Sequence, residues 1–172
     1  ETICSENFKF PQKAETQKSI KQMLTRKNVP DKYYYGKKTY FWNELKENMN
    51  NKDTVYQWRR KYVRENKSNM CPTLTANMGM GGHNVPLVLD RTDRRRKLTP
   101  EECFKFQGYD DIKIPKGISD SALYKQAGNS VTVPLITKIA SQMAIALDLS
   151  LIHISEPTRR TPISYAVFCL KK

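Results

Sequence analysis

The sequence has little of what secreted or membrane proteins carry. Its four cysteines lie far apart without C-x-x-C spacing: Cys4, Cys71, Cys103 and Cys169. This pattern signals neither a metal site nor a disulfide framework, so we expect reduced thiols and a cytoplasmic protein. No apolar run approaches the roughly 20 residues of a membrane-spanning helix, which argues against a membrane protein. Residues 1–11 lack a signal peptide, and because the chain starts with Glu1 we expect that it is cut at its N-terminus.

Acidic residues and histidines are also scarce. The 172 residues include 30 Lys and Arg against 17 Asp and Glu, a formal net charge of +13. Hydrophobic residues make up 38%, below the roughly 45% of an ordinary domain, so the sequence predicts a thin core. The only histidines are His83 and His153, which argues against a His-based catalytic site.

The last part of the chain, residues 149–172, differs in character from what precedes it. It is β-branched and turn-like, and LSLIHISEPTR followed by ISYAVFCLKK resembles a translated sequencing adapter. We interpret this segment as an artefactual tail; the alternative is a natural C-terminal pair of strands. The tail holds four basic residues and one acidic residue, so residues 1–148 keep 26 and 16 and a net charge of +10.

Hydrophobic spacing predicts a mixed, α+β architecture. It favours short helices over 15–27 and 40–49, and strands over 54–63, 73–78 and 85–90. The Gly-rich segment 79–83 lies between the last two strands and is typical of a hairpin loop.

Capping signals predict helices in the C-terminal third. Thr99 as N-cap, Pro100 at the first position and Glu102 as capping-box partner begin one helix, which Gly108 ends. A longer helix starts near Thr132, because Pro134 is tolerated only in a first turn. Its apolar stripe consists of Leu135, Ile136, Ile139, Ala140, Met143, Ala144 and Leu147. The preceding helix is too small to cover this stripe, so we expect it to dock on a sheet that the chain lacks.

Basic residues concentrate between Thr54 and Lys97, a stretch that contains ten basic and three acidic residues. Arginines interleaved with Tyr and Trp on strands, beside a Gly-rich loop flanked by Thr, Asn and His, suit a nucleic-acid surface. The alternative is a solvated charged face. Gly128, Asn129 and Ser130 would form a capping turn at a helix start, whose free N–H groups suit an anion or a polar ligand.

Three segments resemble the C-terminal portion of the bacterial DNA (cytosine-5)-methyltransferases of restriction-modification systems. Residues 96–109, RKLTPEECFKFQGY, resemble the ninth motif of that family, and residues 122–131, ALYKQAGNSV, resemble the tenth. Residues 71–87, with YQWRR at 56–60 before them, resemble the end of the target-recognition domain. The resemblance covers most of residues 1–148.

The resemblance implies a fragment of a larger enzyme. Residues 1–95 would be a small basic, mainly-β target-recognition region, and residues 96–148 would be helices that pack on a missing Rossmann-like methyltransferase sheet. The first eight motifs of the family, with the Pro-Cys-Gln nucleophile and the Glu-Asn-Val acid, are absent from this sequence. We therefore assign no catalytic residue, take none of Cys4, Cys71 and Cys103 for the nucleophile, and expect the isolated chain to be inactive.

By the same resemblance, the parent enzyme transfers a methyl group from S-adenosylmethionine to C5 of a cytosine flipped out of a specific duplex sequence. Asn129, Ser130 and Val131 would line the cofactor pocket. Residues 96–109 would also fix the recognition region against the catalytic one. The expected DNA-binding residues are Arg59, Arg60, Arg64, Thr73, Thr75, Asn77, His83, Arg96 and Lys97.

The expected partners are double-stranded DNA and the missing N-terminal catalytic half, in a parent that is otherwise a monomer; no metal and no membrane are expected. A function of another class stays open at this point. The chain would then be a stand-alone basic DNA- or RNA-binding module with no enzymatic parent.

Overall fold

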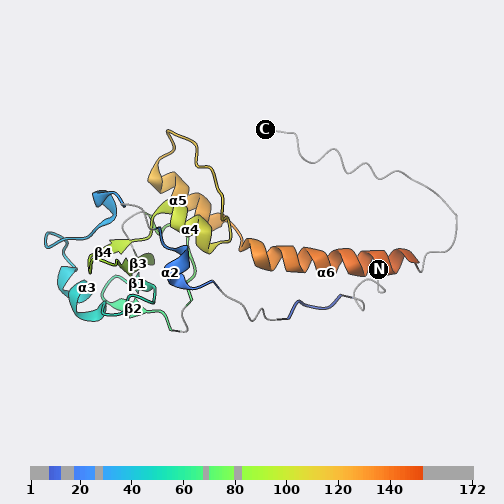
Figure 1. Ribbon diagram of the computed structural model, residues 1–172, viewed down its shortest axis with the longest axis horizontal. Coiled ribbons are helices and arrows are strands. Elements are labelled where there is room, and N and C mark those ends of the chain that lie inside the picture. Colours follow the sequence, from blue (N-terminus) through green and yellow to red (C-terminus); the bar gives the residue numbers. More distant parts are fainter. Residues whose placement is uncertain (1–7, 13–17, 26–28, 68–69, 80–82, 153–172) are drawn as a thin grey trace. The chain divides into compact units, whose positions relative to one another are not determined.

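The computed structural model describes residues 8–12, 18–25, 29–67, 70–79 and 83–152 (Figure 1). Two compact units are distinguished along the chain, one of Gln12–Thr137 and one of Glu1–Pro11 with Lys138–Lys172. The elements are α2 (Ile20–Met23), the 3₁₀ helix η1 (Asp31–Tyr33), α3 (Trp42–Asn48), β1 (Tyr56–Trp58), β2 (Val63–Glu65), β3 (Val85–Leu89), β4 (Arg95–Lys97), α4 (Pro100–Phe106), α5 (Asp120–Asn129) and α6 (Val133–Ile152).

The strands form one antiparallel sheet in the order β2-β1-β3-β4. The strand predicted over 54–63 is in fact two strands, since the chain turns after Trp58 and pairs that residue with Val63. Arg60 lies in the left-handed region at φ 64° within this turn. A non-glycine residue rarely adopts this conformation, and the apolar pattern of the segment does not reveal it.

The strand predicted over 73–78 is wrong. These residues form an irregular segment and a turn, in which the Met78 N–H donates to the Thr75 carbonyl over 3.1 Å. Leu74 and Met78 are buried in a core cluster that also holds Leu123 and Ala127 of α5. Their spacing therefore reflects packing on a helix. The predicted hairpin loop fails with the strand, because β3 pairs with β1 and β4, and residues 80–82 lie outside the described residues.

Two hydrophobic clusters lie on the two faces of the sheet. Val85, Leu87 and Leu89 of β3 belong to the cluster that contains residues of α3, β1 and β2. Val88, between them in sequence, belongs to the cluster of α4 and α5. Because successive side chains of a strand point to opposite faces, β3, one of the two inner strands of the sheet, is buried on both sides.

The predicted start of α4 is confirmed. The Glu102 N–H donates to Thr99 Oγ1 over 3.3 Å, and the Thr99 N–H donates to Glu102 Oε2 over 2.8 Å. Gly108 follows the helix with φ 93°, as a C-terminal glycine requires. The capping turn predicted at Gly128 is wrong, because Gly128 and Asn129 form the last turn of α5 and the next helix begins only at Val133.

Helix α6 starts close to the predicted residue, with Pro134 in its first turn. Most of its predicted apolar stripe is exposed, including Leu135 at 53%, Met143 at 52% and Leu147 at 52%. The helical backbone continues past residue 148, the predicted boundary of the tail, as far as Ile152; residues 153–172 lie outside the described residues.

By length and composition alone, the stretch Asp120–Leu147 would be able to cross a membrane, although the sequence predicted no such run. The backbone leaves the helical conformation over 130–132, which divides the stretch into α5 and the first part of α6. A single stretch of this kind is weak evidence for a membrane span.

Candidate nucleic-acid interface

The turn between β1 and β2 carries a group of exposed cations. Arg59, Arg60 and Lys61 are exposed in the turn, and Arg64 is exposed on β2. The Arg59 N–H donates to the Tyr62 carbonyl over 2.9 Å, which closes the turn. We call Arg59, Arg60, Lys61 and Arg64 the hairpin cations.

The base of this turn is rigid. Trp58, the last residue of β1, is 2% exposed, and its ring stacks on Phe41 with centroids 4.3 Å apart and planes 18° from parallel. Asn84, at φ 68°, donates its N–H to the Trp58 carbonyl over 2.8 Å. His83 directly precedes Asn84, so the structure places this predicted residue at the same end of the sheet as Arg59.

A second group of arginines, on and before β4, has a different environment. Arg95 donates from Nε to the Leu45 carbonyl over 3.2 Å and from Nη2 to the Met49 carbonyl over 3.4 Å, so it holds the C-terminal end of α3. The Arg94 guanidinium lies 3.8 Å from the centroid of the Tyr34 ring. These cations contact the protein itself.

Arg96 was expected to contact DNA, but the structure buries it. Its side chain is 1% exposed, and its guanidinium makes two hydrogen bonds to Glu102, from Nη1 to Oε2 over 2.7 Å and from Nη2 to Oε1 over 2.8 Å. Glu102 Oε1 also accepts from the Thr25 N–H over 2.8 Å. A guanidinium that is buried and bound in this way offers no surface to a phosphate, so Arg96 is not a DNA contact. It joins β4 to α4.

Lys97 is half-buried, and its ammonium lies 5.7 Å from the centroid of the Tyr33 ring and 5.4 Å from that of Tyr124. Burial, as the largest effect, lowers the pKa of Lys97 below its ordinary value. The contacts join β4 to η1 and α5. We therefore leave Lys97 out of the candidate surface as well.

The predicted DNA contacts at Thr73, Thr75 and Asn77 lie in the segment that packs on α5. Thr75 Oγ1 donates to Asn77 Oδ1 over 2.7 Å. A Cβ added at Gly128 would lie 2.3 Å from the Thr75 carbonyl carbon. The backbone of this segment can therefore approach α5 so closely only because residue 128 is a glycine. These residues are thus grouped with α5, and the hairpin cations are grouped with β1 and β2.

The predicted cofactor residues form the connection between α5 and α6. Asn129 and Val131 are exposed, and Ser130 Oγ donates to the Ala127 carbonyl over 2.8 Å. Gln107, at the end of α4, holds the segment that follows. Its carbonyl accepts from the Val133 N–H over 2.8 Å, and its Oε1 accepts from Thr132 Oγ1 over 2.9 Å. The sequence pattern contains no signal for this role of Gln107.

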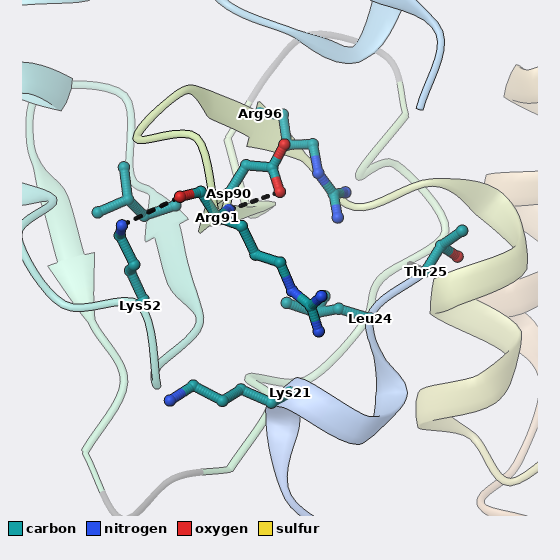
Figure 2. A pocket seen from close by; sticks show the side chains of 8 residues that line it. Lys21, Leu24, Thr25, Lys52, Asp90, Arg91 and Arg96 are labelled. Carbon is teal, nitrogen blue, oxygen red and sulfur yellow. Dashed lines mark hydrogen bonds between the residues drawn. The ribbon is translucent and has the colours of Figure 1, made fainter. Parts of the chain in front are cut away.

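A pocket of about 70 Å³ is lined in part by basic side chains. Figure 2 shows Lys21, Lys52, Arg91 and Arg96 around it. Lys52 Nζ donates to the Arg91 carbonyl over 3.2 Å, and the Arg91 N–H donates to Asp90 Oδ1 over 2.7 Å. Lys21 forms an ion pair with Asp53, and Lys52 forms one with Asp93. Nearby carboxylates thus balance these lysines, so the pocket is a weaker candidate for DNA binding than the hairpin.

The described cysteines are poor nucleophiles. Burial raises the pKa of Cys71 to about 12 and raises that of Cys103 well above its ordinary value. The thiolate is the nucleophilic form, and burial disfavours it. Cys4 and Cys169 lie outside the described residues. Within the part of the chain that the structure describes, no group of three or more His, Cys, Asp or Glu residues is arranged to hold a metal ion.

Comparison with curated proteins identifies methyltransferases among the relatives. The type II methyltransferase M.Bsp6I of Bacillus sp. (strain RFL6) is 53% identical over 139 residues, which are 80% of this chain and 44% of that protein. The type II methyltransferase M.SsoII of Shigella sonnei is 32% identical over 145 residues, 83% of this chain and 36% of that protein. The chain therefore spans less than half the length of these relatives.

Solved structures support the fold. The Entamoeba histolytica methyltransferase EhMeth matches 81% of this chain with a TM-score of 0.55 at 17% identity. The S. pombe Dnmt2 methyltransferase matches 80% of this chain and 45% of its own, with a TM-score of 0.56 at 15% identity. The family model for C-5 cytosine-specific DNA methylases matches residues 2–144, which favours the methyltransferase interpretation over a stand-alone module. The chain belongs to the C-5 cytosine-specific DNA methylase family.

Proposed function

We propose that this chain is the DNA-recognition part, together with one wall of the cofactor pocket, of a restriction-modification DNA (cytosine-5)-methyltransferase. The complete enzyme transfers a methyl group from S-adenosylmethionine to C5 of a cytosine in a specific duplex sequence. The family match over residues 2–144 supports this function. In the proposal, residues 1–95 recognise DNA, residues 96–148 complete the catalytic domain, and residues 149–172 are an artefactual tail.

The observation that carries the DNA-binding part of the proposal is the set of hairpin cations. They are exposed at one turn, whereas the arginines of β4 contact carbonyls, carboxylates and aromatic rings of the protein. Exposed arginines neutralise phosphates and release counterions, which provides a large part of the affinity for duplex DNA. Thr73, Thr75, Asn77 and His83 add short polar side chains that suit base edges.

The α5–α6 connection fits one side of a cofactor pocket. Asn129 and Val131 offer an exposed amide next to an exposed apolar side chain, and the bonds from Gln107 hold the following residues in place. This pairing suits a ligand with polar groups and an apolar ring. S-adenosylmethionine would supply the methyl group, and Asn129, Ser130 and Val131 would bind and orient it.

The exposed stripe of α6 supports the view that a catalytic half is missing. Large apolar side chains such as Leu135 and Met143 are more than half exposed on one helix, and burial of each would stabilise a contact by roughly 1.5 to 3 kcal/mol. The proposed occupant is the N-terminal catalytic part of the parent enzyme, because the chain spans only 44% of its relative M.Bsp6I. The reassembled protein would be a cytoplasmic monomer on DNA.

Complementation tests this proposal. The chain is mixed with the part of M.Bsp6I that lies outside the matched region, labelled S-adenosylmethionine and mixed-sequence duplex DNA. We expect no labelled cytosine from either piece alone and labelled 5-methylcytosine from the mixture. Turnover by the chain alone would contradict the proposal.

Two variants of α6 make the experiment specific. Leu135→Asp with Met143→Asp should abolish complementation and leave DNA binding intact, whereas Lys138→Asp, off the apolar stripe, should reduce neither. DNA binding by the chain, with no methyl transfer from the mixture and no physical association of the two pieces, would favour the stand-alone module instead.

A further inference from the structure

Arg59 differs from the other hairpin cations in how its guanidinium is held. Its Nη1 donates to the side-chain oxygen of Gln57 over 3.3 Å and also to that of Asn84. Within the described residues, Arg60 and Arg64 have no such side-chain hydrogen bonds. One arginine of the group is therefore oriented by neighbouring side chains, and the other two are not.

Both residues that hold Arg59 are themselves fixed. Gln57 is 6% exposed in the middle of β1, where it lies opposite Arg64 of β2 and Pro86 of β3. Asn84 is tied through its N–H to the Trp58 carbonyl. Because Gln57 belongs to the sheet and Asn84 is bonded to its end, the guanidinium is oriented before any ligand arrives, and less side-chain entropy is lost on binding.

The two supports are neutral amides, so the positive charge of Arg59 is uncompensated. Bonding through Nη1 leaves the opposite edge of the guanidinium, Nε and Nη2, without a partner within the described residues. This edge presents two parallel N–H donors. They match two acceptors side by side, as in O6 and N7 of guanine in the major groove or in two oxygens of a phosphate.

We propose that Arg59 reads a guanine of the target sequence, with Gln57 and Asn84 as positioning residues. An oriented fork favours guanine over phosphate, because base reading needs one fixed plane, whereas phosphates accept contacts from mobile side chains such as those of Arg60 and Arg64. This inference rests on the proposed DNA-recognition function and extends it from affinity to specificity.

Selection of duplexes from a randomised pool tests the inference, with the full chain as the protein. The wild-type chain should enrich sequences with a guanine at one or more positions. Arg59→Lys keeps the charge and removes the fork, so it should lower the preference for guanine at one position about tenfold or more. Arg60→Lys is the matched control and should leave the base preferences unchanged.

A modified base distinguishes guanine from phosphate as the ligand. Replacing that guanine by 7-deazaguanine removes the N7 acceptor; it should weaken the wild type about tenfold and leave Arg59→Lys nearly unaffected. Asn84→Ala should give a smaller loss of the same preference, because it frees Arg59 without removing it. Salt dependence of binding should be similar for wild type and Arg59→Lys.

The outcomes separate this inference from the function beneath it. If the wild-type chain has base preferences that Arg59→Lys leaves unchanged, or if Arg59→Lys weakens all duplexes equally, Arg59 does not read a base, while DNA recognition stands. If the wild-type chain binds no duplex DNA, the proposed function and this inference both fail.

Discussion

Two arginine-rich regions of this protein have different environments. The turn between β1 and β2 exposes Arg59 and Arg60, whereas Arg95 and Arg96 of β4 are bound by groups of the protein. The first region lies in and next to the turn that joins β1 and β2, and its cationic side chains are exposed. The second lies between the end of α3 and the start of α4, whose carbonyl and carboxylate oxygens accept its donors.

The comparison teaches that a cluster of basic residues in a sequence has two possible fates. A cation at a turn is solvated and available to DNA, while a cation on an inner element must be paired, because an unpaired buried charge is costly. Counting the basic residues from Thr54 to Lys97 as one DNA-binding surface merges the two regions.

The largest effect is expected at the buried pair. Arg96→Met leaves Glu102 buried without its counter-ion, so the free energy of unfolding should fall by about 3–5 kcal/mol. Urea denaturation followed by circular dichroism measures it. Arg64→Met, on the exposed side of β2, is the control and should change stability by less than about 0.5 kcal/mol. A similar loss of unfolding free energy in the two variants would mean that Arg96 is no more tightly bound than Arg64.

The hairpin cations should matter for binding and not for stability. Replacing Arg59, Arg60 and Arg64 together by Ala should reduce the slope of log affinity against log salt by roughly 2, since Arg60 and Arg64 are the expected phosphate contacts and each contributes about 0.9. Fluorescence anisotropy with a labelled duplex measures the slope. The control removes the same charge from exposed lysines away from the hairpin, at Lys113, Lys116 and Lys125. An unchanged slope in the hairpin variant would make this turn a solvated face.

Two glycines allow a second comparison, between a crowded position on α5 and an uncrowded position in a loop. Gly128→Ala would place a Cβ against the Thr75 backbone, and overpacking of this kind lowers stability by about 1–3 kcal/mol. Gly36→Ala meets no atom within 4 Å and is the matched control. Thermal melts measure the melting temperature of both variants. Equal melting temperatures would mean that residue 128 of α5 does not contact the Thr75 backbone.

The smallest effect concerns pH. Burial raises the pKa of Asp120, but the hydrogen bonds from Lys32 and Tyr33 outweigh it and leave the pKa below its ordinary value. A carboxyl with a lowered pKa stabilises the fold above its ordinary pKa, and this contribution is lost as pH falls through the folded-state value.

Because the carboxylate and Lys32 are partly exposed, the contribution should stay below about 1 kcal/mol. Asp120→Asn should lower stability at pH 7 and reduce its dependence on pH between about 5 and 2, in contrast to the exposed control Asp111→Asn. If stability depends on pH in the same way in the wild type and in Asp120→Asn, the bonds from Lys32 and Tyr33 to Asp120 do not contribute to stability.

Local rules predicted the starts of α4 and α6, but they missed helix α5 at Asp120–Asn129 and predicted the strands less well. Thr99, Pro100 and Glu102 lie within four positions of one another, so the start of α4 can be recognised from the sequence. The strand predicted over 73–78 failed because an alternation of apolar residues does not reveal whether they pack on a sheet or on a helix. Leu74 and Met78 lie in the core with residues of α5.

The candidate site shows the same division. The hairpin cations were recognised from composition, and the structure brings them together at one turn. Gln57 and Asn84 were missed as supports of Arg59, because Asn84 is 25 positions away and becomes a neighbour only when β3 pairs with β1. Arg96 was misassigned, because its charge is visible in the sequence but its burial is not.

The capped start of α4, the start of α6, the excess of basic charge and the resemblance to the methylase family can all be recognised from the sequence. These features depend on residues that are close along the chain or on composition. Only the tertiary structure shows which arginines are exposed to solvent and which are bound by other groups of the protein. That outcome depends on contacts such as the one between Thr25 and Glu102, 77 positions apart, which form only when α4 packs near α2 and β4.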